Sequence, residues 1–375
     1  MNRKSFAVIA VLVLLALVAA ACQTTTEPGP VETVIVQETV EVIVTVEVPV
    51  EGEAPISAER GEIYQRVVDR GTLICGGRTD LAGFGMLDDS GRNEGFDIDI
   101  CRAVAAAVLG DPEAIEVVPL TAAERGPALQ TGEVDLLTRN VTWTTSRDAQ
   151  WGNFTQVVFY DGQGYMVRAD SGITSPDQMD GATVCVTTGT TTELNLANDF
   201  RQRGLSFEAQ PFEDTATVYS TYEEGGCDVT TSDRSQLAAV RSGFADPDAH
   251  VILDAVISKE PLTPAVPSGD DQWFDIVKVV VWGLINAEEL GVTQANVEDM
   301  KGSDSIETRT LLGAEGEWGA ADLGLSEDAI AVAVAAVGNY GEIYDRYLGP
   351  DALNIPRGVN NLWTEGGIIY APPFK

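Results

Sequence analysis

The sequence contains a single histidine and none of the common catalytic signatures. His250 follows the loop-like segment 246–249 and has no histidine or cysteine nearby, which favours a structural surface role over metal binding or general-base work. The chain also lacks a G-x-S-x-G motif, an H-E-x-x-H motif and a P-loop. We therefore predict no metal, no cofactor and no enzymatic activity.

Basic residues are scarce. The chain has 23 lysines and arginines against 58 aspartates and glutamates, which gives a formal net charge of −35. Phosphate backbones repel so acidic a chain, and the composition therefore excludes nucleic acid as a partner. A high net charge instead keeps an exported protein soluble.

The one long apolar run lies at the N-terminus, in residues 6–21, after Arg3 and Lys4. This pattern predicts a cleaved signal peptide over residues 1–21, with a retained N-terminal anchor as the alternative. Small residues directly before Cys22 resemble a bacterial lipoprotein signal, although Ala19 stands where such signals usually have leucine. Cys22 is then the lipidated N-terminus of an extracytoplasmic, membrane-anchored protein, periplasmic or on the outer face of the membrane.

Residues 22–55 are polar and acidic, with valine and isoleucine alternating loosely from residue 31 to 50. No turn or partner strand is nearby, and a lone strand is unstable. We interpret the segment as an extended tether; a strand added to the folded body is the alternative. About 320 residues follow, too many for one typical core, so two lobes are expected.

From residue 58 onward, strand and helix patterns alternate, and the same βαβαβ order occurs twice. This order predicts an α/β fold in which each lobe has a doubly wound, mainly parallel sheet covered on both faces. A serine–proline pair at residues 175–176 predicts a helix start. The expected strands are 72–75, 115–118, 134–137, 183–186, 207–210 and 227–231, and the expected helices are 96–109, 122–130, 191–203 and 215–224.

The third strand of each unit ends in a polar loop. The first loop supplies Asn140, Thr142 and Arg147, and the second supplies Ser232 and Asp233. Ligands of open α/β sheets bind beyond the carboxyl ends of the strands, and arginine pairs well with a carboxylate. The two loops therefore predict a site between facing lobes, although glycine and aspartate near a strand are also ordinary turn chemistry.

Several long motifs occur in an order that resembles one family. They lie at residues 95–104 (GFDIDICRAV), 140–144 (NVTWT), 160–164 (YDGQG), 188–195 (TGTTTELN) and 268–274 (SGDDQWF). Residues 60–375 resemble the general L-amino-acid-binding proteins of polar amino-acid ABC importers. The resemblance implies a monomer with a periplasmic-binding-protein fold that binds free L-amino acids and delivers them to a membrane permease.

The resemblance also assigns the domains. Lobe one is expected to comprise residues 56–162 and 258–375, and lobe two residues 163–257. The chain crosses between lobes near 160–164 and 257–265, which permits hinge closure over a ligand. We expect a long Ala/Val-rich helix near residues 326–347 to complete lobe one.

By resemblance, Arg147 holds the α-carboxylate of the ligand and Asp233 holds its α-ammonium. Gly189, Thr190 and Thr191 begin a helix whose N–H groups favour an anion. The alternatives are a surface salt bridge for Arg147, plain capping by Thr190 and a turn role for Asp233. Asn140 and Thr142 are expected to supply further contacts.

Aromatic and basic residues near the expected cleft are additional candidates. Phe84 resembles an aromatic lid over the ligand side chain, and Trp143 and Tyr160 are candidate cleft residues, with core packing as the alternative. Arg125 and Arg139 are candidates for contact with a polar or acidic ligand side chain, with solvated charges as the alternative.

Besides Cys22, the chain has two cysteines in each expected lobe. The first and third strands of a doubly wound unit are neighbours, which places Cys185 near Cys227 and predicts a disulfide there. We also predict a disulfide between Cys75 and Cys101, although buried free thiols are an alternative for both pairs.

Two other functions fit parts of the pattern. A prephenate or arogenate dehydratase on the same scaffold is the main alternative, but it requires a carboxylic acid in the cleft that protonates a leaving hydroxyl. No residue is singled out for that role. An extracytoplasmic sensor domain is the third possibility.

Overall fold

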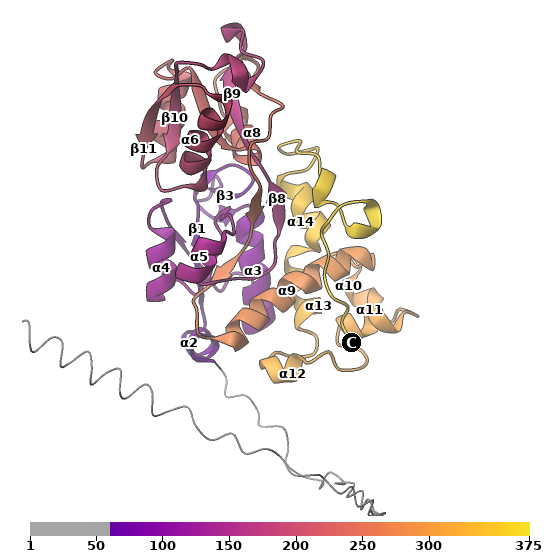
Figure 1. Ribbon diagram of the computed structural model, residues 1–375. Helices are drawn as coiled ribbons and strands as arrows, with labels where there is room; N and C mark the ends of the chain where they lie inside the picture. Colours follow the sequence, from indigo (N-terminus) through magenta and orange to yellow (C-terminus); the bar gives the residue numbers. More distant parts are fainter. Residues whose placement is uncertain (1–60) are drawn as a thin grey trace, which may run out of the picture. The chain divides into compact units, whose positions relative to one another are not determined.

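The computed structural model describes residues 61–375. The predicted signal peptide, Cys22 and the tether lie outside the described residues. The described chain forms two lobes, each built on a five-stranded sheet. Figure 1 shows β8 (Phe159–Asp161) as a strand running between them. No helix in residues 61–375 combines the length and apolar content needed to cross a membrane.

The sheet of lobe one is mixed. Its first three strands are parallel, while β15 is antiparallel to β6 and to β7. In spatial order the strands are β5 (Ile115–Pro119), β1 (Leu73–Gly77), β6 (Leu136–Leu137), β15 (Ala265–Val266) and β7 (Asn153–Phe154). Leu73 and Cys75 pack into the large core with α3 (Phe96–Leu109), whereas Ile74 packs with the Leu129 cluster on the other face. Alternate side chains of one strand are thus buried on opposite faces, as a doubly wound sheet requires.

Lobe two repeats this arrangement. Its strands, in spatial order, are β11 (Phe207–Phe212), β10 (Ala182–Thr187), β12 (Val229–Asp233), β9 (Gln163–Arg168) and β13 (His250–Ile252). The first three are parallel, and β9 is antiparallel to both of its neighbours. Val184 and Val186 pack with Phe200 of α6 (Thr191–Arg203), whereas Cys185 packs with Tyr222 of α7 (Thr215–Glu223) on the other face.

Two strands cross between the lobes and form the hinge. β8 pairs antiparallel with β14 (Glu260–Leu262), so that Asp161 lies opposite Glu260. β8 leads directly into β9 of lobe two, and β14 leads back to β15 of lobe one. Both crossings therefore lie where the sequence predicted them.

Helices α3 (Phe96–Leu109) and α6 (Thr191–Arg203) have the bounds expected from the sequence. Gly95 precedes α3 with φ +136°, and a Cβ atom there would lie 2.2 Å from the carbonyl oxygen of Phe84. Only glycine accommodates both the backbone angle and this close approach. The remaining elements of lobe one before the hinge are α2 (Glu62–Arg70), β2 (Asp80–Leu81), β3 (Gly85–Leu87), β4 (Asn93–Glu94), α4 (Arg125–Thr131) and α5 (Thr145–Gln150).

Lobe two is completed by two helices and three short turns of 3₁₀ helix. The helices are α7 (Thr215–Glu223) and α8 (Arg234–Ser242), and the turns are η1 (Ala169–Ser171), η2 (Pro176–Gln178) and η3 (Pro247–Ala249). The expected helix start at Ser175 is confirmed as the capping box of η2.

The prediction of a single long helix over residues 326–347 is wrong. The structure has two helices there, α13 (Ala329–Val337) and α14 (Tyr340–Tyr347). Gly338 has φ +87°, and Asn339 caps α14 in a capping box with Glu342. The other C-terminal elements are α9 (Asp271–Glu289), α10 (Val297–Met300), α11 (Ile306–Leu311), α12 (Ala320–Leu323), η4 (Gly358–Asn360) and η5 (Trp363–Glu365).

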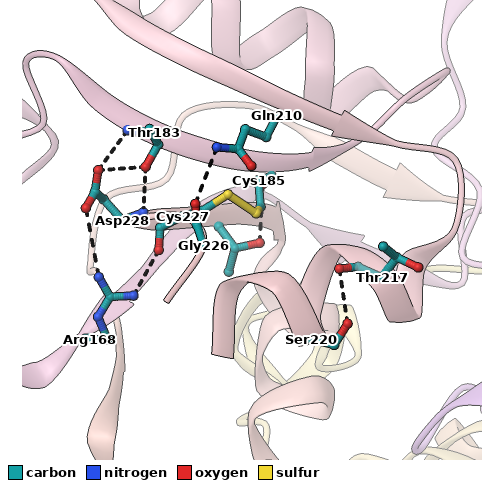
Figure 2. Close-up of a disulfide and its surroundings, with 10 residues drawn as sticks. Arg168, Thr183, Cys185, Gln210, Thr217, Ser220, Gly226, Cys227 and Asp228 are labelled. Atoms are coloured by element: carbon teal, nitrogen blue, oxygen red, sulfur yellow. Dashed lines mark hydrogen bonds and ion pairs between the residues drawn. A yellow bond between two sulfur atoms is a disulfide. The ribbon is translucent and has the colours of Figure 1, made fainter. Parts of the chain in front are cut away.

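The four cysteines of residues 61–375 form the two expected disulfides. Cys185 of β10 joins Cys227, which precedes β12, with Cα atoms 5.7 Å apart (Figure 2). Cys75 of β1 joins Cys101 of α3, with Cα atoms 6.5 Å apart. Both separations lie within the usual range for disulfides.

His250 has a structural role, but it is not a surface residue. It begins β13, is buried, and packs against Tyr222 and Phe244 with ring centroids 5.3 Å and 4.6 Å away. Its Nδ1 lies 3.1 Å from the Tyr222 hydroxyl. Burial lowers the pKa of His250, so its neutral ring belongs to the aromatic core of lobe two.

Candidate functional site

The first polar loop lies between β6 and α5 in lobe one. Thr144 caps α5 by accepting a hydrogen bond from the backbone N–H of Arg147 at 3.2 Å. The buried Arg147 guanidinium donates to the carbonyl of Thr142 at 3.0 Å and lies over the ring of Trp151, 4.7 Å from its centroid. Capping and stacking together fix the direction of this cation.

The predicted helix start at Gly189, Thr190 and Thr191 lies between β10 and α6 in lobe two. Thr190 caps α6 by accepting from the N–H of Glu193, and its own hydroxyl donates to the carbonyl of Thr187 at 2.7 Å. The N–H of Gly189 donates to the Glu193 carboxylate at 3.1 Å. The glycine N–H expected to bind an anion is therefore already occupied, and that part of the prediction does not fit the structure.

One pocket brings most of the predicted residues together. It holds about 420 Å³ of space, part of it open solvent. Polar residues of both lobes line it: Arg78, Arg125, Arg139, Asn140, Thr142 and Arg147 from lobe one, and Thr187, Thr190, Thr191, Thr192, Thr215, Ser232, Asp233 and Gln236 from lobe two. A pocket lined by polar groups from two sides suits a small charged ligand.

Three arginines in the pocket have no carboxylate partner among the described residues. Arg125, Arg139 and Arg147 are buried, and none forms an ion pair in residues 61–375. Burial lowers the pKa of Arg125 to about 9, and the charges of Arg147 and Arg78 contribute to this lowering. Burial also lowers the pKa of Arg139 and of Arg147. Binding of an anion is strongly favourable beside desolvated cations that have no counter-ion.

Asp233 supplies the opposite charge. It ends β12, is buried, and accepts no hydrogen bond from any group of the described chain. Burial raises the pKa of its carboxyl well above the ordinary value, and the nearby charges of Asp161 and Glu260 raise it further. A carboxylate held in this way gains most from a cationic group brought by a ligand.

Glu260 of the hinge is a residue that the sequence analysis missed. One carboxylate oxygen accepts from the hydroxyls of Thr142 at 2.6 Å and Thr191 at 3.0 Å. The other accepts from Asn195 at 2.8 Å and from Ser258 at 2.5 Å. Glu260 thus joins the hinge to both lobes. The sequence feature that could have indicated its role is a charged residue within a proline-containing crossing between the lobes.

Direct hydrogen bonds close the pocket on one side. Gln236 of α8 accepts from Arg78 and from the Asn140 side chain, both at 3.0 Å. The Asn140 N–H donates to Asp97 at 2.7 Å, and Asn140 has a positive φ of +35°. The side-chain oxygen of Asn140 is buried without a donor from the described chain. The two lobes are therefore in contact in this conformation.

The three aromatic candidates lie outside the pocket. Phe84 is fully buried between Phe96 and Phe159, with ring centroids 6.4 Å and 6.0 Å away, so it does not fit the role of a lid. Trp143 is 38% exposed and stacks on Phe154. Tyr160 exchanges two backbone hydrogen bonds with the Asn360 side chain behind the hinge. For Phe84 the structure therefore supports core packing, which the sequence analysis gave as the alternative to a role in the cleft.

No cluster of three or more histidine, cysteine, aspartate or glutamate side chains in residues 61–375 has metal-binding geometry.

Two α/β lobes, a two-stranded hinge and a charged pocket lined by both lobes define a solute-binding protein. The chain belongs to the bacterial extracellular solute-binding proteins, family 3, whose model matches residues 73–296.

Two relatives with high sequence identity are binding proteins rather than enzymes. The general L-amino acid-binding periplasmic protein AapJ of Rhizobium johnstonii is 48% identical over 322 residues, which cover 85% of this chain and 94% of the relative. The glutamate/glutamine/aspartate/asparagine-binding protein BztA of Rhodobacter capsulatus is 46% identical, covering 82% and 91%. These similarities favour binding over the dehydratase alternative.

A solved structure shows the same fold. The ABC transporter periplasmic binding protein from Brucella ovis, with glutathione bound, is 46% identical to this chain. The match covers 83% of this chain and 99% of that protein, with a TM-score of 0.81.

Proposed function

We propose that the protein captures free L-amino acids outside the cytoplasm and delivers them to an ABC importer in the membrane. The observation that carries this proposal is that one pocket holds a buried cation with no carboxylate partner among the described residues, Arg147, and a buried carboxylate with no donor among them, Asp233. A free amino acid carries both opposite charges on one carbon. The names of AapJ and BztA support the same class of ligand.

Arg147 binds the α-carboxylate in this proposal, through the guanidinium N–H groups that Thr142 leaves free. Asp233 binds the α-ammonium from the other lobe. The ligand then contacts both lobes at once, which favours the closed hinge.

Thr142 and Thr191 complete the ammonium site. Each hydroxyl donates its hydrogen to Glu260, so only its lone pairs remain for the pocket. They accept N–H groups from the ligand and do not donate to its carboxylate. Asn140 lines the same pocket with a side-chain oxygen that lacks a donor.

A thermal-shift screen of residues 56–375 against the twenty amino acids tests the function. A ligand present at about 100 times its Kd should stabilise the protein by roughly 2.7 kcal/mol. We expect polar amino acids to give the largest shifts. No shift with any amino acid, together with binding of a sugar or a metal ion, would exclude the proposal.

The envelope attachment is a separate proposal. Removal of residues 1–21 leaves Cys22 as a lipidated N-terminus, and residues 22–55 tether the folded body to the membrane. Lobe one then comprises residues 56–162 and 258–375, lobe two residues 163–257, and the protein is a monomer. Mass spectrometry of membrane-extracted protein should show a diacylglyceryl group on Cys22; an unmodified cysteine in a longer chain would contradict it.

A further inference from the structure

We propose that the site also takes amino acids extended through the side chain, such as γ-glutamyl amides, with the extension lying in a second compartment beside the main pocket. This inference rests on the proposed function, because it uses the same contacts to the α-carboxylate and the α-ammonium.

The second compartment holds about 500 Å³ of space, part of it open solvent. It shares three lining residues with the main pocket: Arg78, Arg139 and Thr215. Like the main pocket, it receives residues from both lobes, Pro119 and Leu120 from lobe one and Glu213 from lobe two. Arg139 therefore lies at the boundary that the two compartments share.

Arg139 is the chemical reason to place a ligand group at this junction. Its Nε donates to the carbonyl of Leu120, whereas its two terminal nitrogens have no partner in residues 61–375. The side chain is 6% exposed and forms no ion pair there. A carboxylate or amide oxygen at the end of a ligand side chain supplies the acceptor that these donors lack.

The linkage must be through the side chain. Arg147 and Asp233 need a free α-carboxylate and a free α-ammonium. A peptide bond to the α-carboxyl removes the first of these charges, while an amide on the side-chain carboxyl leaves both. The geometry of the two compartments therefore distinguishes γ-linked from α-linked dipeptides.

The outer compartment offers acceptors for the amide N–H of the extension as well as the cations Arg78 and Arg139. Beyond Arg78 and Arg139, its charged residues are the carboxylates of Asp80, Glu213 and Asp214. Asp80 is paired with Arg78, and Asp214 caps α7 by accepting from Thr217 at 2.7 Å. Glu213 has no hydrogen bond or ion pair with any described residue and is exposed, so it is available to accept the amide N–H of the extension.

Calorimetry with three ligands tests the inference: L-glutamate, γ-glutamylalanine and α-glutamylalanine. We expect the first two to bind with affinities within about tenfold of each other, and the α-linked dipeptide to bind at least about 100-fold more weakly, about 2.7 kcal/mol. If glutamate binds and γ-glutamylalanine does not, the inference is wrong and the proposed function stands. If no amino acid binds, the proposed function fails.

A pair of variants locates the extension. Glu213→Trp fills the outer compartment, and Glu224→Trp, a matched change of an exposed glutamate at the other end of α7, does not. We expect Glu213→Trp to weaken γ-glutamylalanine at least tenfold and to leave glutamate binding unchanged, while Glu224→Trp changes neither. Equal affinities for γ-glutamylalanine in both variants would overturn the assignment, and the comparison of γ- and α-linked ligands in the unaltered protein decides the outcome if a variant does not fold.

Discussion

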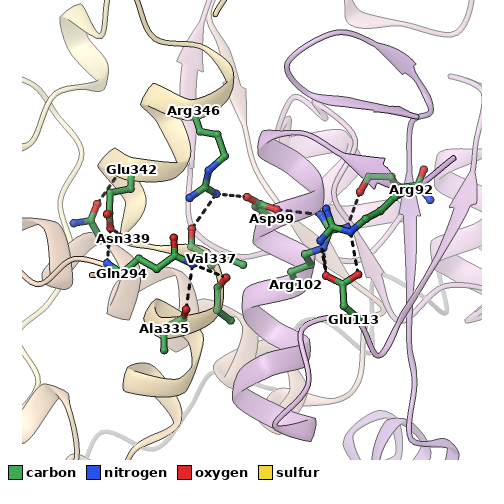
Figure 3. A network of polar contacts seen from close by, with 12 residues as sticks. Arg92, Asp99, Arg102, Glu113, Gln294, Ala335, Val337, Asn339, Glu342 and Arg346 are labelled. Carbon is green, nitrogen blue, oxygen red and sulfur yellow. Dashed lines mark hydrogen bonds and ion pairs between the residues drawn. The ribbon is translucent and has the colours of Figure 1, made fainter. Parts of the chain in front are cut away.

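Buried charges are treated in opposite ways in two regions of this molecule. In the first region, at α3, carboxylates pair with the buried guanidinium of Arg102 and with Arg346 of α14 (Figure 3). Arg102 donates to Asp99 at 3.1 Å and to Glu113 at 3.2 Å, and Arg346 of α14 donates to Asp99 at 2.6 Å. These contacts join α3 to the C-terminal part of the lobe, and their charges are satisfied within the protein.

In the second region, the pocket, Arg78 pairs with Asp80, but the other three buried guanidinium groups bond to backbone carbonyls instead of carboxylates. Arg125 donates to Ala122, Arg139 to Leu120 and Arg147 to Thr142. Breaking a buried ion pair is strongly destabilising, whereas removing an isolated buried charge is not. The difference between the two regions therefore separates charges that stabilise the fold from charges that bind a ligand.

The largest effect is expected from Asp99→Ala, which leaves Arg102 buried without its main partner. We expect the free energy of unfolding to fall by about 3–5 kcal/mol, with ligand affinity unchanged in the folded protein. Denaturant unfolding followed by calorimetry measures both quantities. Asp89→Ala, a change at an exposed aspartate, is the control; equal stability of the two variants would break the comparison.

Arg147→Ala is expected to act in the opposite manner. The affinity for every amino acid should fall by about 1.5–3 kcal/mol, because the contact is to the shared α-carboxylate. The ligand-free protein should lose little stability, since the cation has no counter-ion to leave behind. Arg147→Met, which keeps an apolar stem over Trp151, controls for lost packing. A loss confined to acidic ligands would show that Arg147 contacts the side chain instead.

Local features of the sequence were sufficient for much of the fold. The bounds of α3 and α6 follow from local sequence patterns, whereas the family resemblance placed the two hinge crossings. Gly338 and the Asn339 capping box could have predicted the break between α13 and α14. The sequence analysis missed it because the segment is rich in alanine and valine, which favoured one continuous helix.

The parts of the site that were missed depend on contacts between distant segments. Glu260 binds Thr142 and Thr191, which lie 118 and 69 residues away. Phe84 is in the core because Phe96 and Phe159 meet it there, and the identity of an aromatic residue does not show which way it points. Whether such a residue lies in the site or in the core depends on which distant residues it contacts, and its residue type alone does not show this.

Asp233→Asn tests the same comparison, between paired and unpaired buried charges, for a carboxylate. We expect all amino acids to bind about tenfold more weakly, or about 1.4 kcal/mol, because the α-ammonium loses its counter-charge. The ligand-free protein should not become less stable. Asp135→Asn is the matched control: Asp135 is buried and pairs with Arg66 and Arg70, so this change should destabilise the fold. Loss of stability in Asp233→Asn equal to that in Asp135→Asn would contradict the division.

Arg139→Ala tests whether the unpaired cations have separate tasks. Because Arg139 lies at the junction of the two compartments, its removal should change the preference among side chains and leave the shared contacts intact. We expect glutamate to lose roughly 1 kcal/mol in affinity relative to serine. Competition binding with these two ligands measures the ratio directly. An equal loss for both would place Arg139 at the α-carboxylate.

The last prediction concerns the pH dependence of stability and Asp97, at the start of α3. Its buried carboxylate accepts a hydrogen bond from Asn140 and forms no ion pair with the described residues, and burial raises its pKa to about 7. Between about pH 4 and 7 the folded state therefore keeps a proton that the unfolded state has lost. Stability should fall as pH rises through this range, by at most about 1.4 kcal/mol per pH unit, and should fall no further above it. Urea unfolding of the ligand-free protein at several pH values should show this slope, and Asp97→Asn should flatten it; parallel slopes in the two proteins would mean that another group titrates.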